Sequence, residues 1–393
     1  MPEAVVVSAA RTAVGTGMKG TLADVDPFDL ATRTLSEVLE RAGIPGDEVD
    51  DVVLAETLQG GGAIARYAAV EAGMPHVPGL AHNRHCASGL AAIQTAAGSI
   101  RAGMDRVVIA GGVHSSSLMP RSKRRVPGSD DWEDWMSPTH PDLPEAPARD
   151  MSITVGWNAA RLAGVTREEM DAWALRSHQR AIAGIDEGRF TDEIFPVAVE
   201  LRDGSTTMFS VDEHPRRDTT LEKLAGLKPI HPEIDGFSIT AGNASGVNDG
   251  SGALLLTDDS YAEEHSLTPL AVVRSWASVG VPPEETGLAP TKAIPKALKR
   301  AGLDIEDIDL WEINEAFASM CVATTRILGI SEDRTNVLGS GCSLGHPIGM
   351  TGARMSITLI HELRRRGGGL GVAAMCAGGG MGSATVFEVL PGS

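Results

Sequence analysis

The 393-residue sequence predicts an α/β fold built from two similar halves, and three observations support this prediction. Short apolar runs alternate with amphipathic runs of helical length, which is typical of sheets covered by helices. The same order of elements occurs twice along the chain. Glycine is frequent, with 45 residues, whereas aromatic residues make up only 4%. This composition indicates tight turns and close packing of the backbone.

The elements of the first half follow from apolar periodicity. Strands are predicted at residues 5–8, 49–54 and 106–112, and helices over residues 29–42, 66–72 and 87–102. Gly43 ends the first of these helices. Because strands and helices alternate, we expect a mostly parallel sheet that is covered on both faces.

The second half repeats this order. Residues 41–50 match residues 300–309, an offset of 259 residues (300 minus 41). At this offset Glu56 falls on Glu315, and Cys86 falls next to His346. The strands at 5–8 and 107–112 have counterparts at 271–274 and 372–379. Four matched elements in one order predict an internal duplication of the fold.

A segment of different character, residues 117–246, separates the two halves. Residues 121–148 are rich in Pro, Asp, Glu and Trp without periodicity, and they predict a long ordered loop or a subunit contact. Residues 166–187 predict a helix that begins with a capping box, and residues 217–229 are basic and loop-like. We expect this segment to cover the ends of the strands as a lid or ligand clamp.

Composition excludes several classes of function. A net charge of −18 argues against non-specific binding to nucleic acid or to anionic membranes. No apolar run approaches the length of a membrane span, and neither terminus resembles a targeting signal, so we expect a cytoplasmic protein. The four cysteines lack zinc-type spacing, so we expect free thiols and no metal site: Cys86, Cys321, Cys342 and Cys376.

Residues 83–90 carry the first candidate catalytic residue. Cys86 is predicted to lie between a short strand and the helix over residues 87–102, where free N–H groups and the helix dipole would lower the pKa of its thiol. Small residues after it leave room for a substrate. From this stretch alone, a buried structural cysteine is an equal alternative.

Three further positions could complete a catalytic site. His346 lies in a turn bracketed by glycines at the duplicate position of Cys86, and a base beside a cysteine creates a thiolate. Cys376 precedes a glycine run whose N–H groups could bind an oxyanion, although a tight turn with an inert thiol is the alternative. Asn314 ends a strand and could position a water, hold a histidine or cap a helix.

With these sites in place, the whole chain resembles the thiolase family. Five motifs carry the resemblance: NRHCASGL at 83–90, AGNASGVNDG at 241–250, NEAF at 314–317, GHPIG at 345–349 and CAGGGMG at 376–382. The resemblance implies duplicated βαβ halves in a layered α-β-α-β-α core. Residues 1–116 and 247–267 would form the N-terminal half, 117–246 an inserted loop domain for coenzyme A (CoA) binding and subunit contacts, and 268–393 the C-terminal half.

The resemblance also implies a mechanism and roles for individual residues. Cys86 would take an acyl group as a thioester, His346 would activate it, and Cys376 would move a proton to or from the second substrate. His346 and Asn314, the latter through a water, would stabilise the enolate oxygen of a thioester. Backbone N–H groups of Cys86 and Gly378 would form the other oxyanion hole.

The substrates implied are CoA and acyl-CoA, with no permanently bound cofactor. The implied reaction cleaves 3-ketoacyl-CoA with CoA, or runs the reverse Claisen condensation, in a homodimer or homotetramer. Arg216, Leu227 and Ser245 match CoA contacts of the family. The chain departs from the usual pattern at His85, where Gln or another polar residue is common, and at His114, where Glu is common.

Two alternatives of other classes remain. A decarboxylating condensing enzyme of the ketoacyl-synthase kind shares the duplicated fold, but such enzymes usually pair the cysteine with two histidines or with His and Asn. Cys376 in a glycine run speaks against it. A non-catalytic CoA- or lipid-binding scaffold would be expected to lose Cys86 or the NEAF motif, and this chain keeps both.

Overall fold

Ten strands form one mixed sheet in the computed structural model of this chain, which describes residues 2–392. Their order is β12-β13-β14-β11-β1-β10-β5-β3-β4, and β2 pairs with β10. One side of the sheet contains β1 (Ala4–Arg11), β2 (Gly15–Thr16), β3 (Asp51–Ala55), β4 (Gly79–His82), β5 (Val107–Ser115) and β10 (Asn248–Asp258). The other contains β11 (Ala271–Gly280), β12 (Leu310–Ile313), β13 (Gly369–Ala377) and β14 (Met381–Val389).

The expectation of a mostly parallel sheet is wrong. The pairs β3–β4, β3–β5 and β12–β13 are parallel, and the other pairs of this sheet are antiparallel. The reason is the length of the connections. A three-residue turn joins β13 to β14, which is too short for the crossover that parallel neighbours need. The two sides of the sheet meet where Val5 and Val6 of β1 pair with β11.

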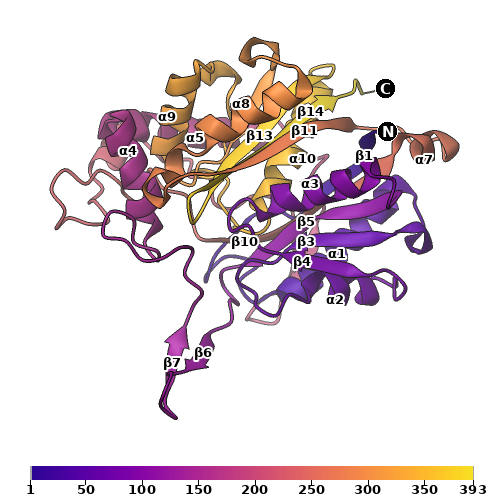
Figure 1. Cartoon of the computed structure of the whole chain (residues 1–393), viewed down its shortest axis with the longest axis horizontal. Coiled ribbons are helices and arrows are strands. Elements are labelled where there is room, and N and C mark those ends of the chain that lie inside the picture. Colours follow the sequence, from indigo (N-terminus) through magenta and orange to yellow (C-terminus); the bar gives the residue numbers. More distant parts are fainter. Residues whose placement is uncertain (1, 393) are drawn as a thin grey trace.

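Helices cover both outer faces and also fill the space between the two sides of the sheet (Figure 1). Helices α1 and α2 pack on the first side, α8 packs on β11 and β14, and α3 and α10 pack against each other in the middle. This confirms the layered α-β-α-β-α order. The helices are α1 (Pro27–Ala42), α2 (Ile64–Glu71), α3 (Ser88–Arg101), α4 (Asn158–Ala163), α5 (Arg167–Asp186), α6 (Leu221–Ala225), α7 (Asp259–Glu264), α8 (Pro290–Ala301), α9 (Ala318–Leu328) and α10 (Thr351–Arg365), with a π-helical turn at Ser152–Trp157 and 3₁₀ turns at Gly46–Glu48, Pro283–Leu288, Ile305–Asp307 and Glu332–Arg334.

The predicted duplication is confirmed in the geometry. Helices α1 and α8 both end in a left-handed glycine, Gly43 with φ 67° and Gly302 with φ 70°, a conformation that favours glycine. Each glycine is followed by a 3₁₀ turn and then by the strand β3 or β12. The order strand, helix, strand then continues through α3 and β5 in one half, and through α10 and β13 in the other.

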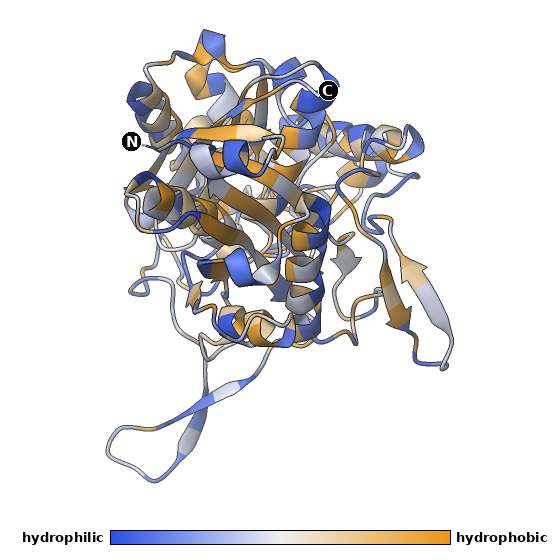
Figure 2. Cartoon of the chain, turned by 90° about the vertical axis from the view of Figure 1, so that its right-hand side faces the viewer, coloured by the Kyte–Doolittle hydropathy of each residue, from blue (hydrophilic) through white to orange (hydrophobic). Residues whose placement is uncertain are grey.

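The middle layer contributes a large apolar cluster to the core. Leu90 and Ile93 of α3, and Ile357 and Ile360 of α10, are fully buried among side chains from both sides of the sheet. Figure 2 shows the apolar strands in the interior and hydrophilic segments at the periphery. Burial of this surface is the main force that holds the two halves together.

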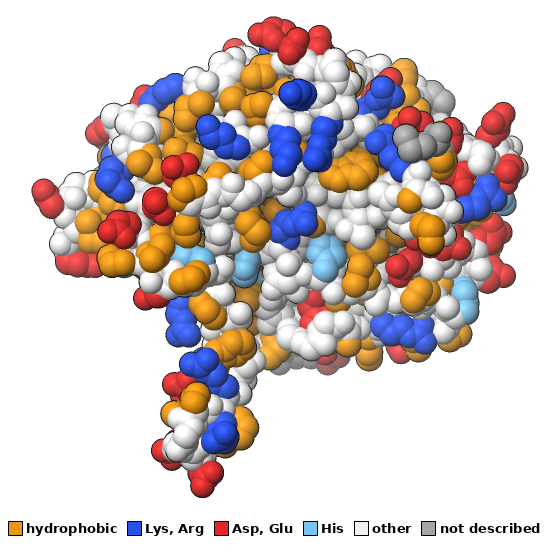
Figure 3. Space-filling model, viewed as in Figure 1, with side chains coloured by type: hydrophobic (Ala, Val, Ile, Leu, Met, Phe, Trp, Pro, Cys, Tyr) orange, Lys and Arg blue, Asp and Glu red, His pale blue; other side chains and the backbone are white. Residues whose placement is uncertain are grey.

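Residues 117–246, all of which the structure describes, contribute no strand to the large sheet. They form two hairpins, β6 (Ser122–Arg125) with β7 (Trp132–Trp135) and β8 (Val197–Glu200) with β9 (Thr206–Phe209). The first hairpin projects from the body and carries charged side chains of both signs (Figures 1 and 3). A wholly irregular segment at 121–148 was therefore the wrong expectation, and residues 217–229 include the short helix α6.

Two contacts in this segment have a clear physical basis. The capping box predicted at the start of α5 is confirmed, since Thr166 and Glu169 bond reciprocally to each other's backbone N–H. A buried ion cluster fastens the segment to the sheet. The Arg11 guanidinium at the end of β1 donates to Glu193 at 2.7 Å and to Asp212 at 2.8 Å, and all three side chains are fully buried. Removing one member would leave a buried charge without a partner.

The backbones of α3 and α10 touch at their first turns. A Cβ added to Gly89 would lie 2.7 Å from the backbone nitrogen of Ala353, and one added to Gly352 would overlap the nitrogen of Leu90. A Cβ on Gly112 of β5 would overlap the carbonyl oxygen of Gly349. Because the obstructing atoms belong to the backbone of another element, only glycine permits this approach. It brings the turn before α3 close to the turn before α10.

We predict that Gly89→Ala lowers the free energy of unfolding by about 2–3 kcal/mol, because overpacking forces the two helices apart. Denaturant unfolding monitored by circular dichroism measures this difference. Gly98→Ala in the same helix is the matched control. Its Cβ would meet only a Trp276 ring carbon at 3.7 Å, so it should be neutral or stabilise by up to about 1 kcal/mol. Equal unfolding midpoints for the two variants would contradict the packing argument.

Candidate active site

Cys86 lies in the turn between β4 and α3 and is partly buried. The backbone N–H of Gly378 lies close enough to its sulfur to lower the pKa of the thiol, as does the backbone N–H of Cys86 itself. Gly378 begins the glycine turn between β13 and β14, where Gly379 has φ 88° and Gly380 has φ 76°. The candidate nucleophile of one half therefore contacts the glycine run of the other half.

The expected lowering of the Cys86 pKa by the helix terminus is wrong. Burial raises the pKa of the thiol to about 11, and the two N–H groups oppose this rise only in part. The first N–H groups of α3 are already used. Ala87 N–H donates to the Arg84 carbonyl at 3.1 Å, and Ser88 N–H donates to the His85 carbonyl at 3.0 Å. A separate base is thus needed to form a thiolate at neutral pH.

His346 lies in the turn before α10 and is buried. Its Nδ1 is 2.7 Å from Oγ1 of Thr351, and this hydroxyl donates to the Pro347 carbonyl at 2.8 Å. Because the hydroxyl proton is used there, Nδ1 must carry the hydrogen, and Nε2 is the unprotonated nitrogen that can accept a proton. Burial, His114 and Arg354 together lower the pKa of His346 to about 3, and burial has the largest effect. The imidazole is neutral and available as a base.

Asn314 joins His346 to the end of β13. Its Nδ2 lies 3.4 Å from Nε2 of His346, and its backbone N–H donates to the Ala374 carbonyl at 3.0 Å. Its buried Oδ1 has no hydrogen-bond partner among residues 2–392, a position that suits a water molecule. Asn314 does not cap a helix, because α9 begins at Ala318 after Phe317, so that alternative is wrong.

Cys376 is fully buried near the end of β13, with its sulfur 3.5 Å from the Met320 sulfur. Burial raises the pKa of its thiol well above the usual range, and the neighbouring Cys86 raises it further. The two cysteines therefore lie close together and cannot both ionise at low cost. Cys376 rests as a neutral thiol that can donate a proton.

The site residues predicted from the sequence form two linked groups. Cys86, Cys376 and Gly378 form one group, and His346 with Asn314 forms the other. The pairing of β12 with β13 and the contact between α3 and α10 join the two groups. A Cβ added to Gly89 would lie 3.1 Å from the carbonyl oxygen of Gly349, so the turn that carries Cys86 and the turn that carries His346 are neighbours.

The three predicted CoA contacts lie on the inserted segment beside this site. Ser245 N–H donates to the Ala316 carbonyl in the NEAF motif at 2.9 Å, and Leu227 packs against Gly242. Arg216 is exposed, and its backbone N–H donates to Nδ1 of His178 at 3.1 Å. Its guanidinium makes no ion pair within residues 2–392, whereas the neighbouring Arg217 and Lys223 are paired with Asp186 and Asp218.

Sequence reasoning missed three residues that support His346. Thr351 fixes the tautomer of the His346 ring. The Oδ1 of Asn248 accepts a hydrogen bond from the backbone N–H of His346 at 3.0 Å. His114 is fully buried nearby and lowers its pKa. Asn248 was named only as part of a motif and His114 only as a departure from one. The position of Thr351, five residues after His346, was the signal in the sequence that could have identified it.

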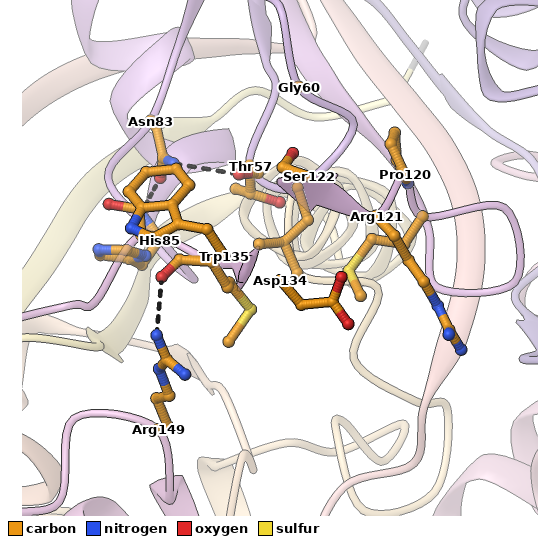
Figure 4. A pocket seen from close by; sticks show the side chains of 14 residues that line it. Thr57, Gly60, Asn83, His85, Pro120, Arg121, Ser122, Asp134, Trp135 and Arg149 are labelled. Atoms are coloured by element: carbon orange, nitrogen blue, oxygen red, sulfur yellow. Dashed lines mark hydrogen bonds between the residues drawn. The ribbon is translucent and has the colours of Figure 1, made fainter. Parts of the chain in front are cut away.

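A cavity of about 620 Å³ opens beside the turn that carries Cys86 (Figure 4). It is lined by residues near Thr57, by Asn83 and His85, and by the first hairpin. The Asn83 side chain donates to the Thr57 carbonyl at 3.1 Å and accepts the His85 N–H at 2.7 Å, as Figure 4 shows. His85 has φ 45°, which is uncommon for a residue other than glycine and fixes the turn before the cysteine.

A duplicated, layered α/β core with a cysteine turn between its halves is the architecture of a thiolase-type enzyme. A comparison with models of known protein families agrees with this assignment. Residues 4–260 match the model described as "Thiolase, N-terminal domain", and residues 267–389 match "Thiolase, C-terminal domain". The chain belongs to the thiolase family.

Individual relatives cover almost the whole chain. A 3-ketoacyl-CoA thiolase of Bacillus subtilis is 42% identical over 99% of this chain and 100% of its own length. An acetyl-CoA acetyltransferase of Escherichia coli is 40% identical with the same coverage. Among solved structures, the acetyl-CoA acetyltransferase of Bacillus anthracis has a TM-score of 0.91 and 41% identity. Human mitochondrial 3-ketoacyl-CoA thiolase has a TM-score of 0.90 and 36% identity, and both structures share 99% coverage with this chain.

We predict that the protein loses stability as the pH falls from 7 to 5. Burial lowers the pKa of His114 to about 4 and that of His346 to about 3. In the unfolded chain both titrate near pH 6.5, so below that pH the unfolded state binds more protons and stability falls. Each histidine should contribute a loss of about 2 kcal/mol at pH 5. Urea unfolding at both pH values measures it.

His114→Gln is the control for this prediction, because it removes one of the buried neutral histidines and should reduce the difference between pH 7 and pH 5. A free energy of unfolding that is the same at both pH values would contradict neutral, buried histidines.

Proposed function

We propose that this chain is an acyltransferase that cleaves 3-ketoacyl-CoA with CoA to give acyl-CoA and acetyl-CoA, or runs the reverse Claisen condensation. One observation carries the proposal: Cys86 lies near a second buried thiol, Cys376, and near the N–H of Gly378, and each of these neighbours affects a pKa in the pair. The nucleophilic sulfur of Cys86 thus has an acid, Cys376, and an N–H donor, Gly378, beside it. The names of the relatives from Bacillus subtilis and Escherichia coli agree with this reaction.

In the cleavage direction, Nε2 of His346 takes the proton of the Cys86 thiol as the sulfur attacks the ketone carbon. The bond between that carbon and the α-carbon breaks, and the electron pair stays on the α-carbon as an enolate. Cys376 donates its proton to this carbon, so acetyl-CoA leaves. The acyl group remains on Cys86 as a thioester.

The second half of the reaction restores the enzyme. The Cys376 thiolate left by the first step takes the proton of the CoA thiol, and the CoA sulfur attacks the thioester carbon. The bond to Cys86 breaks and acyl-CoA leaves, while His346 returns its proton to the Cys86 sulfur. The N–H groups of Cys86 and Gly378 would stabilise the oxyanion on the acyl carbon.

The neutral state of each group suits its proposed role. His346 is neutral and its Nε2 carries no hydrogen, so it can accept a proton. Cys376 is protonated, so it can donate one. The Asn314 Oδ1 without a protein partner would hold the water that, with His346, contacts the enolate oxygen. All groups in this scheme belong to the protein or its substrates, so no permanently bound cofactor is required.

CoA binding is proposed for the inserted segment. Residues 117–246 would form a loop domain between an N-terminal half at 1–116 and 247–267 and a C-terminal half at 268–393. Ser245 and Leu227 would contact the pantetheine arm. Arg216 would meet a phosphate, since its guanidinium makes no ion pair within the described chain, unlike Arg217 and Lys223.

The assembly and its location are also proposals. We propose a homodimer or homotetramer in the cytoplasm, without nucleic-acid or membrane partners. Within residues 2–392, no helix combines the length and apolarity needed to cross a membrane. Analytical ultracentrifugation would decide between dimer, tetramer and monomer.

We predict that Cys86→Ala lowers kcat for cleavage of acetoacetyl-CoA by at least about 10⁴-fold, because no acyl-enzyme can form. Loss of the enolate absorbance of the substrate measures the rate. Mass spectrometry of the wild-type protein with acetyl-CoA should show an acetyl group on Cys86. Activity retained by the variant would refute the assignment. Turnover of malonyl but not acetyl thioesters would favour the decarboxylating alternative, and CoA binding without any adduct would favour a scaffold.

We predict that Arg216→Ala raises the KM for CoA about tenfold with little change in kcat, because a charge-assisted contact to phosphate acts equally in ground and transition states. Steady-state kinetics at saturating 3-ketoacyl-CoA measures both constants. Arg217→Ala is the matched control, since that side chain is paired with Asp186 and should leave the KM within twofold. An equal effect of both variants would point to general surface charge.

A further inference from the structure

We propose that Arg84 is a positioning residue that holds the turn carrying Cys86 in place against the glycine turn carrying Gly378, and so sets the oxyanion hole between the two halves. The proposal rests on the proposed function in taking Cys86 as the nucleophile and these two backbone N–H groups as the donors. It goes further by giving a role to a residue of the NRHCASGL motif that takes no part in the proton transfers.

The turn that carries Cys86 is held together by hydrogen bonds from its own side chains. The Arg84 N–H donates to Oγ of Ser88 at 2.7 Å, and this hydroxyl donates to the His85 carbonyl at 2.7 Å. The Asn83 side chain accepts the His85 N–H at 2.7 Å. Because Cys86 lies between these bonded residues, a shift of Arg84 moves the backbone of the cysteine with it.

The side chain of Arg84 leaves this turn and reaches the C-terminal half. It is partly buried, and its Nη1 donates to Oγ of Ser278 on β11 at 2.8 Å. The same nitrogen lies 3.4 Å from Oε1 of Gln94 on α3. The guanidinium therefore connects the turn, the helix that follows it and a strand of the other half.

The hydrogen bonds continue from Ser278 to β14. Ser278 pairs with Ser383 across the two strands, and their hydroxyls lie 3.1 Å apart. Nε2 of Gln94 donates to Oγ of Ser383 at 2.8 Å and to Oγ1 of Thr385 at 3.0 Å. Gln94, Ser383 and Thr385 are buried, so loss of a partner leaves polar atoms without a substitute from solvent.

Strand β14 connects this network to the glycine turn. The strand begins directly after that turn, and its second residue, Gly382, pairs with Cys376 on β13. Ser383 is the next residue and lies five positions after Gly378 (383 minus 378). The N–H of Gly378 lies close enough to the Cys86 sulfur to lower its pKa. The network thus fixes the distance between the turns that supply the two donors.

A second arginine fastens the other end of α3 to β11. Nη1 of Arg101 donates to the Arg274 carbonyl at 3.1 Å, and its guanidinium also pairs with Glu3 at 2.9 Å. The strand β11 pairs with β1 only at Ala271 and Val272, so both arginines reach the part of its edge beyond that pairing. Arg101 ends the 14-residue helix, about 20 Å from the turn that precedes it. It resembles Arg84 in packing but lies far from the reacting sulfur.

A change in the distance between the two turns affects the oxyanion hole first. Backbone donors stabilise a tetrahedral oxyanion only at about 2.7–3.1 Å, and loss of one donor lowers kcat about 100- to 1000-fold. Without the Arg84 guanidinium, the contact between α3 and α10 still keeps the turns near each other, so we expect a smaller loss. Binding of CoA to the inserted segment should change little.

The first test is steady-state kinetics with acetoacetyl-CoA and CoA. Arg84→Met keeps most of the side-chain volume without the guanidinium, and it should lower kcat by at least about tenfold while the KM for CoA stays within about threefold. Arg101→Met is the matched control and should leave kcat within about twofold. Equal losses of kcat in the two variants would show a packing role only and overturn the proposal.

A double-mutant cycle tests the contact itself. Ser278→Ala removes the acceptor without changing the turn, and it should lower kcat in the same sense as Arg84→Met. Combining the two substitutions should cause no further loss, because both break one contact. Additive losses would show that Arg84 does not act through Ser278 and would overturn the proposal. If Arg84→Met fails to fold by circular dichroism, Ser278→Ala against Arg101→Met is judged by the criterion of the first test.

The acetyl group on Cys86 reports on the oxyanion hole directly. In infrared spectra of the enzyme acetylated with carbonyl-labelled acetyl-CoA, the carbonyl stretch should move to higher frequency in Arg84→Met, because weaker hydrogen bonds leave the C=O bond stronger. It should not move in Arg101→Met. An unchanged frequency in Arg84→Met would overturn the proposal.

Failure of the proposed function gives a different result from failure of this proposal. A wild-type protein that acquires no acetyl group on Cys86 refutes the proposed function. A wild-type protein that is acetylated and active, together with an Arg84→Met variant that has the same kcat and carbonyl frequency, refutes only the role of Arg84.

Discussion

The close approach of α3 and α10 is the constraint on which the rest of the structure depends. Their backbones touch at Gly89 and Gly352, and β5 meets the turn before α10 at Gly112 and Gly349. No side chain separates the halves at these points, so the turn that carries Cys86 and the turn that carries His346 lie at one junction. The duplicated fold supplies two equivalent turns, and the glycines bring them together.

Burial governs the chemistry of this junction. Removing charged groups from water is costly, so Cys86, Cys376, His114 and His346 are all held in their uncharged forms. This matches what acyl transfer through a cysteine needs, namely a base without a proton and an acid that still has one. The fold also buries ion pairs around Arg11 and Arg354, and each of these pairs joins segments that are distant in the sequence.

Local sequence patterns predicted the elements well because their causes are local. A left-handed glycine ends α1 and α8, and a capping box begins α5, whatever the rest of the chain does. The direction of strand pairing was predicted wrongly because it depends on connection length and on where β10 returns after the inserted segment. The pKa of Cys86 was predicted in the wrong direction, since the sequence places it at a helix terminus but does not show that Arg84 and His85 occupy the N–H groups there.

The sequence by itself determined the family, the duplication and the candidate residues Cys86, His346, Cys376, Asn314 and Gly378, because these are fixed by residue identity and by repeat spacing. Only the tertiary structure decided which atoms meet. It gave the tautomer of His346 through Thr351, the Asn314 carbonyl without a hydrogen-bond partner within residues 2–392, and the burial of His114. The physical reason is that charge state and hydrogen bonding depend on burial and on neighbours from distant parts of the chain, and folding alone brings those together.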